Sequence, residues 1–156
     1  MKCLCCGKTL STSNEFGWHK ACIKRFFGTA VLPKIEIDNK TLNIIAKEAT
    51  TLGCTVPGVQ KKLSLQLVSD SKKPRLTLVN YPTGYILKPQ VEEYESLPES
   101  EQLIMTMADV AGIATVPHSL IKCNKGIAYI TKRIDRINLN NKIESLAMED
   151  FCQLDL

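Results

Sequence analysis

Four residues near the N-terminus have the types and the spacing that suit a metal ion. Cys3 and Cys6 are separated by two residues, and His19 and Cys22 follow as a second close pair. Zinc takes four sulfur or nitrogen ligands at tetrahedral corners, which two such pairs supply from two local turns. Because all four positions are filled, the spacing predicts a structural zinc ion and not a catalytic one. The alternative is a cluster of free cysteines with His19 at the surface.

The ligand set has one open point, which is Cys5. This residue can replace Cys3 or Cys6 in the set, or remain a free thiol. The chain has 7 cysteines, an odd number, and in a reducing compartment a dense cluster more often binds metal than forms disulfides. No apolar run has the length of a membrane span, and no apolar signal-peptide core follows the N-terminus. We therefore expect a cytoplasmic protein without a membrane partner.

A second set of residues has the chemistry of a phosphate site. Lys88 ends an apolar segment with the pattern of a strand, and Glu101 lies in the first turns of the helix expected next. A strand lysine paired with a helix glutamate is the arrangement by which kinases hold nucleotide phosphates. Gly58 lies shortly before the strand expected over 63–67. A glycine at this place lets the backbone approach a phosphate closely. Each residue alone has a simpler explanation: a surface lysine, a helix-dipole glutamate and an ordinary turn glycine.

The elements that must position these residues follow from periodicity and turn signals. A short helix is expected from the His19–Cys22 pair to a C-cap at Gly28, and another helix over 41–50. The segment 29–37 between them has the character of an extended connector. Three strands, a helix and a hairpin are then expected, over 63–67, 75–80, 84–88, 98–111, 117–122 and 127–133.

The C-terminal part and the long helix carry two further patterns. An Asn-rich loop over 138–141 is expected to lead to a last helix that starts near Ser145. The helix over 98–111 carries an apolar stripe, which consists of Leu103, Ile104, Met107, Val110 and Ala111.

This order of elements predicts an α+β fold of the protein-kinase N-lobe type, a five-stranded antiparallel sheet with one helix after the third strand, preceded by a small zinc-binding module. The expected domains are a zinc knuckle over 1–28, a connector and helix over 29–52, and the N-lobe with the start of the hinge over 53–156. Apolar residues make up 44% of the chain, enough for a hydrophobic core, and the net charge of +4 is too small to indicate nucleic-acid binding by itself.

Five segments, in the same order, resemble those of HipA-type serine/threonine kinases, the toxins of bacterial toxin–antitoxin systems. Val56-Pro57-Gly58-Val59-Gln60-Lys61-Lys62-Leu63-Ser64-Leu65 resembles their glycine-rich loop, and Tyr85-Ile86-Leu87-Lys88-Pro89 resembles their ATP-lysine strand. The other three segments are 97–113, like the helix with the glutamate, 130–136, like the hinge stretch, and 148–154 just beyond it. The N-terminal knuckle is similar to one that precedes the kinase core in compact relatives.

The resemblance implies a site for ATP with Mg²⁺. In such a site Gly58, Val59 and Gln60 would cover the phosphates, with help from Lys62. Lys88 would hold the α and β phosphates, and Glu101 would orient this lysine. Lys132 to Ile134 would contact the adenine through the backbone, and Asp135 would approach the ribose. Relatives phosphorylate a hydroxyl residue in the glycine-rich loop of the same chain. The matching position is Thr55, which a plain turn threonine explains equally well.

Two residues depart from the family pattern, and the catalytic machinery lies elsewhere. Pro57 stiffens the loop before the glycine, and Ile134 replaces the usual Phe. The family's catalytic Asp and its metal ligands belong to a second lobe that the 156 residues do not include, so we expect turnover only with that lobe. The resemblance further implies a DNA-binding antitoxin and a protein substrate from the translation machinery as partners. The alternative is a zinc-knuckle interaction or regulatory module without kinase activity.

Overall fold

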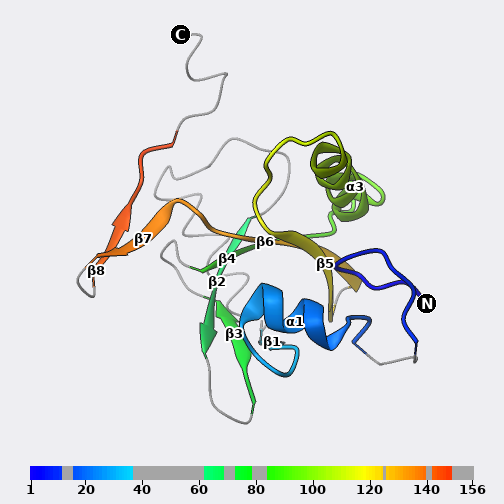
Figure 1. The fold of residues 1–156 in the computed structure, drawn as a ribbon, viewed down its shortest axis with the longest axis horizontal. Coiled ribbons are helices and arrows are strands. Elements are labelled where there is room, and N and C mark those ends of the chain that lie inside the picture. The colour runs from blue at the N-terminus through cyan, green and yellow to red at the C-terminus, as the bar shows by residue number, and fades with distance from the viewer. Residues whose placement is uncertain are drawn as a thin grey trace, which may run out of the picture.

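The computed structural model describes residues 1–11, 16–36, 62–68, 73–78, 84–124, 126–139 and 142–148. Within them lie two helices and eight strands (Figure 1): α1 (Lys20–Phe27), β1 (Lys34–Glu36), β2 (Leu63–Val68), β3 (Arg75–Leu78), β4 (Tyr85–Pro89), α3 (Leu97–Val110), β5 (His118–Cys123), β6 (Gly126–Lys132), β7 (Arg136–Leu139) and β8 (Lys142–Ser145). The helix expected over 41–50 and the loop that contains Thr55, Gly58, Val59 and Gln60 lie outside the described residues.

Six strands form one mixed sheet in the order β1-β3-β2-β4-β6-β5. The five strands from β2 to β6 pair antiparallel, and α3 follows the third of them, as the sequence predicts. The prediction of five strands is corrected by β1, which pairs parallel with β3. The segment after Pro33 was expected to be only a connector, but an extended chain beside an edge strand can complete its hydrogen bonds, and Lys34 N donates to the Pro74 carbonyl at 3.0 Å.

A second correction concerns the C-terminal part of the described chain. Strands β7 (Arg136–Leu139) and β8 (Lys142–Ser145) pair antiparallel, where an Asn-rich loop and the start of a helix were expected. Residues 146–148 are not helical. Apolar and polar residues alternate on both sides of Asn140-Asn141 in the sequence. This two-residue repeat is typical of paired strands and does not match the repeat of a helix.

One face of the sheet packs against α1 and the N-terminal segment to form the hydrophobic core. Leu63, Leu65, Leu76, Leu87 and Ile130 are buried there, together with Trp18, Phe26 and Phe27 from the N-terminal segment. The Phe26 and Tyr85 rings stack with their centroids 6.0 Å apart, and the Tyr85 hydroxyl donates to the Phe26 carbonyl at 3.4 Å. Residues 1–28 therefore share a core with the sheet.

The N-terminal segment also covers an edge of this sheet. The Leu4 carbonyl accepts hydrogen bonds from the Leu120 amide at 3.3 Å and from the Ser119 hydroxyl at 3.1 Å. Since β5 is the last strand of the sheet, Leu4 takes the place that another strand would occupy.

The opposite face of the sheet is covered by α3, which contacts β5 and β6. The helix starts with Pro98 in its first turn and is followed by Gly112 at φ +79°, as the sequence predicts. Its apolar stripe points away from the sheet: Leu103, Ile104, Met107 and Val110 are 60%, 65%, 61% and 85% exposed. The half-buried side chains of α3 that face the sheet include Glu101, Gln102 and Met105.

Tight backbone packing explains Gly84, which precedes β4. Its φ is +56°, and a Cβ atom at this position would lie 2.9 Å from the Leu65 carbonyl oxygen. Only glycine fits both constraints, so this position fixes how β4 enters the sheet beside β2.

Candidate functional site

The structure brings Lys88 and Glu101 together on the face of the sheet that α3 covers. Lys88 lies on β4 and Glu101 on the first turns of α3, and the Lys88 ammonium forms an ion pair with Glu101 Oε1. The two side chains are 21% and 26% exposed, so the pair is partly shielded from water and still reachable by a ligand. The sequence analysis predicted this pair from the kinase arrangement of a strand lysine followed by a helix glutamate.

Tyr129 forms the floor beneath this ion pair. It lies opposite Lys88 on the neighbouring strand β6, and the Lys88 Nζ is 5.4 Å from the centre of its ring. Burial, followed by the charge of Glu101, raises the pKa of the Tyr129 hydroxyl, so the ring stays neutral at physiological pH. A neutral aromatic face next to an ammonium group contributes a cation–π attraction and limits the directions that the lysine can take. The sequence analysis missed Tyr129, whose signal is only its position in an apolar strand.

Strand register places two other predicted residues relative to Lys88. Leu63 pairs with Leu87, so the antiparallel register sets the exposed Lys62 beside Lys88 at the same end of the sheet. Lys132 pairs with Tyr85, three residues before Lys88 on β4, which is about 10 Å along the strand. The predicted phosphate and adenine contacts thus lie at opposite ends of one short strand.

The residues after β6 are arranged around Asp135. Its carboxylate accepts hydrogen bonds from Arg133 Nε at 2.8 Å and from Arg136 Nη1 at 2.6 Å, and it pairs with Arg133 Nη2 as well. The hydrogen bond from Arg133 is the main reason that the pKa of Asp135 is lowered. Ile134, which lies between Arg133 and Asp135 in the sequence, is 53% exposed. A ribose contact by Asp135 would compete with these bonds.

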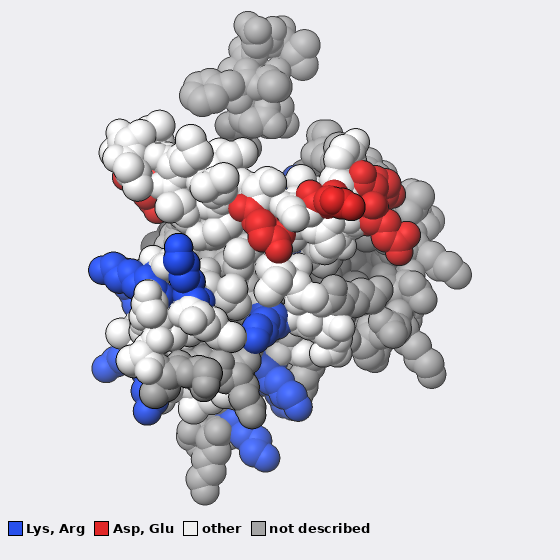
Figure 2. All heavy atoms as spheres, turned by 90° about the vertical axis from the view of Figure 1, so that its right-hand side faces the viewer, with Lys and Arg blue, Asp and Glu red and all other residues white. Residues whose placement is uncertain are grey.

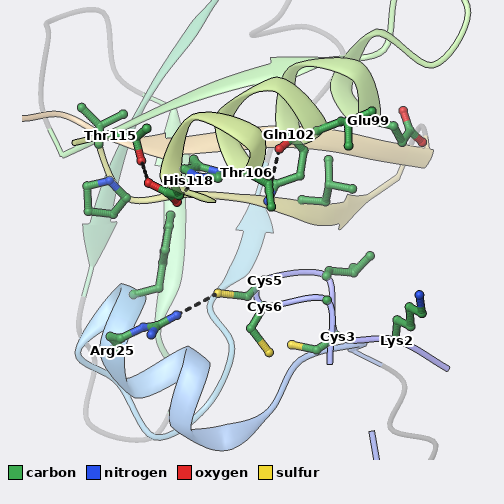
Figure 3. Close-up of a pocket in the computed structure, with 18 residues that line it drawn as sticks. Lys2, Cys3, Cys5, Cys6, Arg25, Glu99, Gln102, Thr106, Thr115 and His118 are labelled. Carbon is green, nitrogen blue, oxygen red and sulfur yellow. Dashed lines mark hydrogen bonds and ion pairs between the residues drawn. The ribbon is translucent and has the colours of Figure 1, made fainter. Parts of the chain in front are cut away.

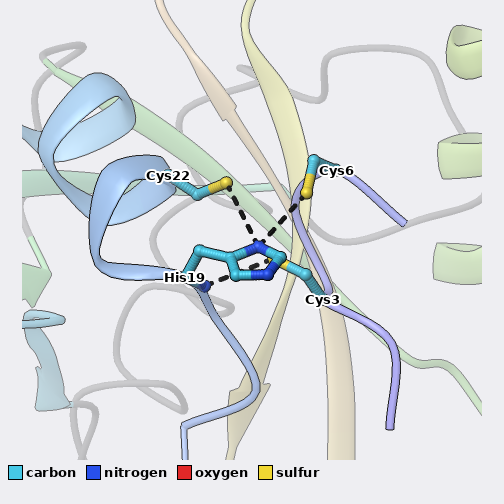
Figure 4. Close-up of side chains that lie close together, drawn as sticks. All are labelled: Cys3, Cys6, His19 and Cys22. Carbon is cyan, nitrogen blue, oxygen red and sulfur yellow. Dashed lines mark hydrogen bonds between the residues drawn. The ribbon is translucent and has the colours of Figure 1, made fainter. Parts of the chain in front are cut away.

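The four predicted metal ligands meet at one point (Figure 4). Cys3 and Cys6 come from the N-terminal loop, His19 directly precedes α1 and Cys22 lies in its first turn, and their ligand atoms all lie within 4.8 Å of one another. His19 Nδ1 is 3.4 Å from Cys6 Sγ and 3.9 Å from Cys22 Sγ. Tetrahedral zinc with ordinary bond lengths sets such atoms about 3.5–3.8 Å apart, so the donor set fits the ion.

The surroundings of the four residues also suit a metal. His19 Nε2 donates to the Thr9 carbonyl at 3.2 Å, which leaves the Nδ1 lone pair directed at the sulfurs. Burial raises the pKa of Cys3, but hydrogen bonds from nearby backbone amides, the largest from Cys6, outweigh it and lower the pKa to about 7. Burial raises the pKa of Cys22. A bound cation would favour both thiolates.

Cys5 is not among these four residues, although its thiol also interacts with Cys22. Its sulfur lies 4.0 Å from an Arg25 guanidinium nitrogen, and burial raises its pKa. Cys5 lines a cleft of about 770 Å³ between the N-terminal loop and α3 (Figure 3). The four side chains that the structure groups together are thus the predicted ones, Cys3, Cys6, His19 and Cys22.

Charged residues are unevenly distributed around this cleft. On the face shown in Figure 2, Asp and Glu side chains gather in the upper part and Lys and Arg below them. The exposed acidic residues near and on α3 are Glu92, Glu93, Glu95, Glu99 and Asp109.

Comparison with known families decides the relationship of the chain. The family model of the HipA-like C-terminal domain matches residues 54–155, about two thirds of the chain. The chain belongs to the HipA-like family. The matched HipA-like region contains Lys88, Glu101 and the segment around Asp135, whereas the four metal ligands precede it. The assignment to the N-terminal half of a kinase stays a prediction.

A search among curated proteins finds no match to the chain. Among the helices of the described residues, none combines the length and the apolar character needed to cross a membrane.

Proposed function

We propose that the HipA-like region is the ATP-binding lobe of a serine/threonine protein kinase. The observation that carries the proposal is the ion pair between Lys88 and Glu101, formed between β4 and α3 over the ring of Tyr129. In protein kinases a strand lysine paired with a helix glutamate holds the nucleotide phosphates in place for transfer. The family match supports the proposal at the level of the family alone, since the matched HipA-like region contains both residues.

In this proposal each residue has a defined task. Lys88 neutralises the α and β phosphates of MgATP, and Glu101 fixes the direction of the lysine side chain. Lys62 adds a second positive charge at the same end of the sheet, next to the loop of Gly58, Val59 and Gln60. The backbone of Lys132 to Ile134 meets the adenine at the other end of β4. Positioning and charge neutralisation account for most of the catalysis of phosphoryl transfer.

The complete kinase needs groups that this lobe does not supply. A second lobe would provide the Asp base and the Mg²⁺ ligands, and the γ-phosphate would pass to a Ser or Thr hydroxyl of a protein substrate from the translation machinery. Thr55 is the proposed site of self-phosphorylation, and a DNA-binding antitoxin is the proposed cytoplasmic partner. A structural Zn²⁺ held by Cys3, Cys6, His19 and Cys22 would stabilise the N-terminal segment against the sheet.

Nucleotide binding by matched lysine variants tests this proposal. Titration calorimetry with MgATP should show that Lys88→Ala lowers the affinity at least tenfold, because the phosphates lose their direct charge partner. Lys34→Ala removes an exposed lysine from β1, the edge strand that is separated from β4 by two other strands. This control should leave the affinity for MgATP unchanged. Equal affinity of wild type and Lys88→Ala, or no binding by the wild type, would overturn the proposal.

A further inference from the structure

A polar network on the cleft side of α3 joins the helix to β5 (Figure 3). His118, the first residue of β5, places Nδ1 3.0 Å from Gln102 Oε1 and Nε2 3.1 Å from Asp109 Oδ2. The Thr115 hydroxyl donates to the other oxygen of Asp109. The His118 side chain is 7% exposed, whereas that of Asp109 is 51% exposed. A single buried imidazole therefore contacts two positions of the helix.

The two contacts lie almost two helical turns apart. Gln102 and Asp109 are separated by seven residues, or about 10 Å along the helix axis. Contacts at both places fix the rotation of α3 about its axis as well as its distance from the sheet. Glu101 directly precedes Gln102, so the same contacts determine where the Glu101 carboxylate points.

Apolar packing accounts for only part of this rotation, since on α3 Pro98 is buried and Met105 is half-buried. Four other large apolar side chains, Leu103, Ile104, Met107 and Val110, are exposed on the side away from the sheet. Burial of such side chains usually determines which face of a helix meets a sheet. A rotation that buried the stripe would carry Glu101 away from Lys88, since the stripe and Glu101 occupy different sides of the helix. The polar contacts of His118 therefore add to this limited apolar packing in holding the observed orientation.

The network also touches the residues of the proposed nucleotide site. The His118 ring stacks on Tyr129 at 6.3 Å between centroids and 17° between planes. Tyr129 is the residue whose ring lies beneath Lys88. One continuous row of contacts thus runs from Asp109 through His118 and Tyr129 to Lys88 and Glu101.

We propose that His118 is a positioning residue that, through Gln102 and Asp109, holds α3 in the rotation in which Glu101 pairs with Lys88. This inference rests on the proposed nucleotide site and adds a residue to it. His118 touches no substrate in this proposal; it acts through the helix. Kinases require the lysine–glutamate pair to be in place, so a residue that sets the helix rotation controls nucleotide affinity.

The variant His118→Phe separates positioning from packing. Phenylalanine keeps an aromatic ring against Tyr129 and removes both polar contacts to α3. MgATP affinity should fall about fivefold, because the Lys88–Glu101 pair then forms in only part of the molecules. In a Glu101→Gln background the same substitution should have almost no further effect, because the two changes remove one shared interaction. Unchanged affinity in the single variant, or full additivity in the double variant, would overturn the proposal.

A second measurement keeps the inference distinct from the nucleotide site itself. Hydrogen exchange of the α3 amides over 101–108 should become at least threefold faster in His118→Phe, whereas Met107→Ala on the outer side of the helix should leave it unchanged. This result is expected even if the wild type proves unable to bind ATP, in which case only the proposed function fails. Unaltered exchange would reject the role of His118. Should His118→Phe not fold, Asp109→Ala at the half-exposed end of the network gives the same two readouts.

Discussion

The two faces of the sheet share every strand but carry different kinds of side chains. Tyr85 and Leu87 on β4 are buried against the core beneath α1, whereas Lys88 on the same strand pairs with Glu101 beneath α3. The first face is held by apolar burial. The second is held by an ion pair and the contacts of His118. The comparison indicates that one face is packed with apolar side chains, whereas the other carries the polar side chains of the proposed nucleotide site.

The largest loss of stability is expected on the face that packs against α1, when a proposed metal ligand is removed. Cys22→Ser eliminates a buried ligand, and the variant should lose its zinc and much of the order of residues 1–28. Metal binding contributes on the order of 10 kcal/mol in comparable small modules, so the melting temperature should fall sharply. Atomic emission and calorimetry measure the two quantities. Cys123→Ser, at a half-buried cysteine outside the ligand group, should retain the metal; zinc loss in both variants would contradict the assignment.

Adjacent residues of β4 compare the two faces directly. Leu87→Ala opens a cavity in the core and should cost about 2–5 kcal/mol of unfolding free energy. Ile86→Ala changes a half-buried side chain on the other face and should cost about 1 kcal/mol, because less apolar area is lost. Urea denaturation of the two variants gives both values. Equal costs would mean that the faces do not differ in packing.

Two methionines of α3 test the orientation of the helix. Met105 is half-buried toward the sheet, and Met107 lies in the exposed stripe. Met105→Lys should cost about 2 kcal/mol, because a charge must leave water or the helix must shift. Met107→Lys should change stability by less than ~0.5 kcal/mol. The reverse order, measured by thermal unfolding, would show that the stripe and not the network side faces the sheet.

The smallest effect is expected where the chain leaves the sheet, at Asp135. Arg133 keeps the pKa of this carboxyl below its ordinary value of 3.8, so the folded state is stabilised at neutral pH. That contribution is present above the pKa of the unfolded chain and is lost as the pH falls through the lower folded pKa. The unfolding free energy of Asp135→Asn should therefore be ~1 kcal/mol lower than that of the wild type at pH 7. This difference between the two proteins should disappear below about pH 4. A gap that stays constant from pH 7 to pH 3 would refute this account.

Much of the described part of the fold could be predicted from local patterns. Alternation located β2, turn signals bounded β4 and β6, and Pro98 with Gly112 bounded α3. The spacing of Cys3, Cys6, His19 and Cys22 identified a group that the structure brings together. Each of these signals depends on only a few residues that are close in the chain, so it can be recognised in a single amino-acid sequence.

The remaining features depend on contacts between distant segments. Strand β1 exists because the edge of β3 offers hydrogen bonds, which nothing in residues 34–36 reveals. The outward direction of the α3 stripe opposes its amphipathic pattern, and His118 has no local signal of its role. The loop with Gly58 and the helix over 41–50 lie outside the described residues, so these predictions stay untested.

The contact between Leu4 and β5 has a consequence for how the chain behaves in concentrated solution. Leu4 lies between Cys3 and Cys6, so the loop that would grip the metal is the same loop that occupies the outer rim of the sheet. A strand whose rim is uncovered offers its amides and carbonyls to other molecules and invites intermolecular pairing. If the loop holds zinc as proposed, chelation should uncover this edge of β5 and favour pairing between molecules, which would link metal supply to solubility as well as to folding.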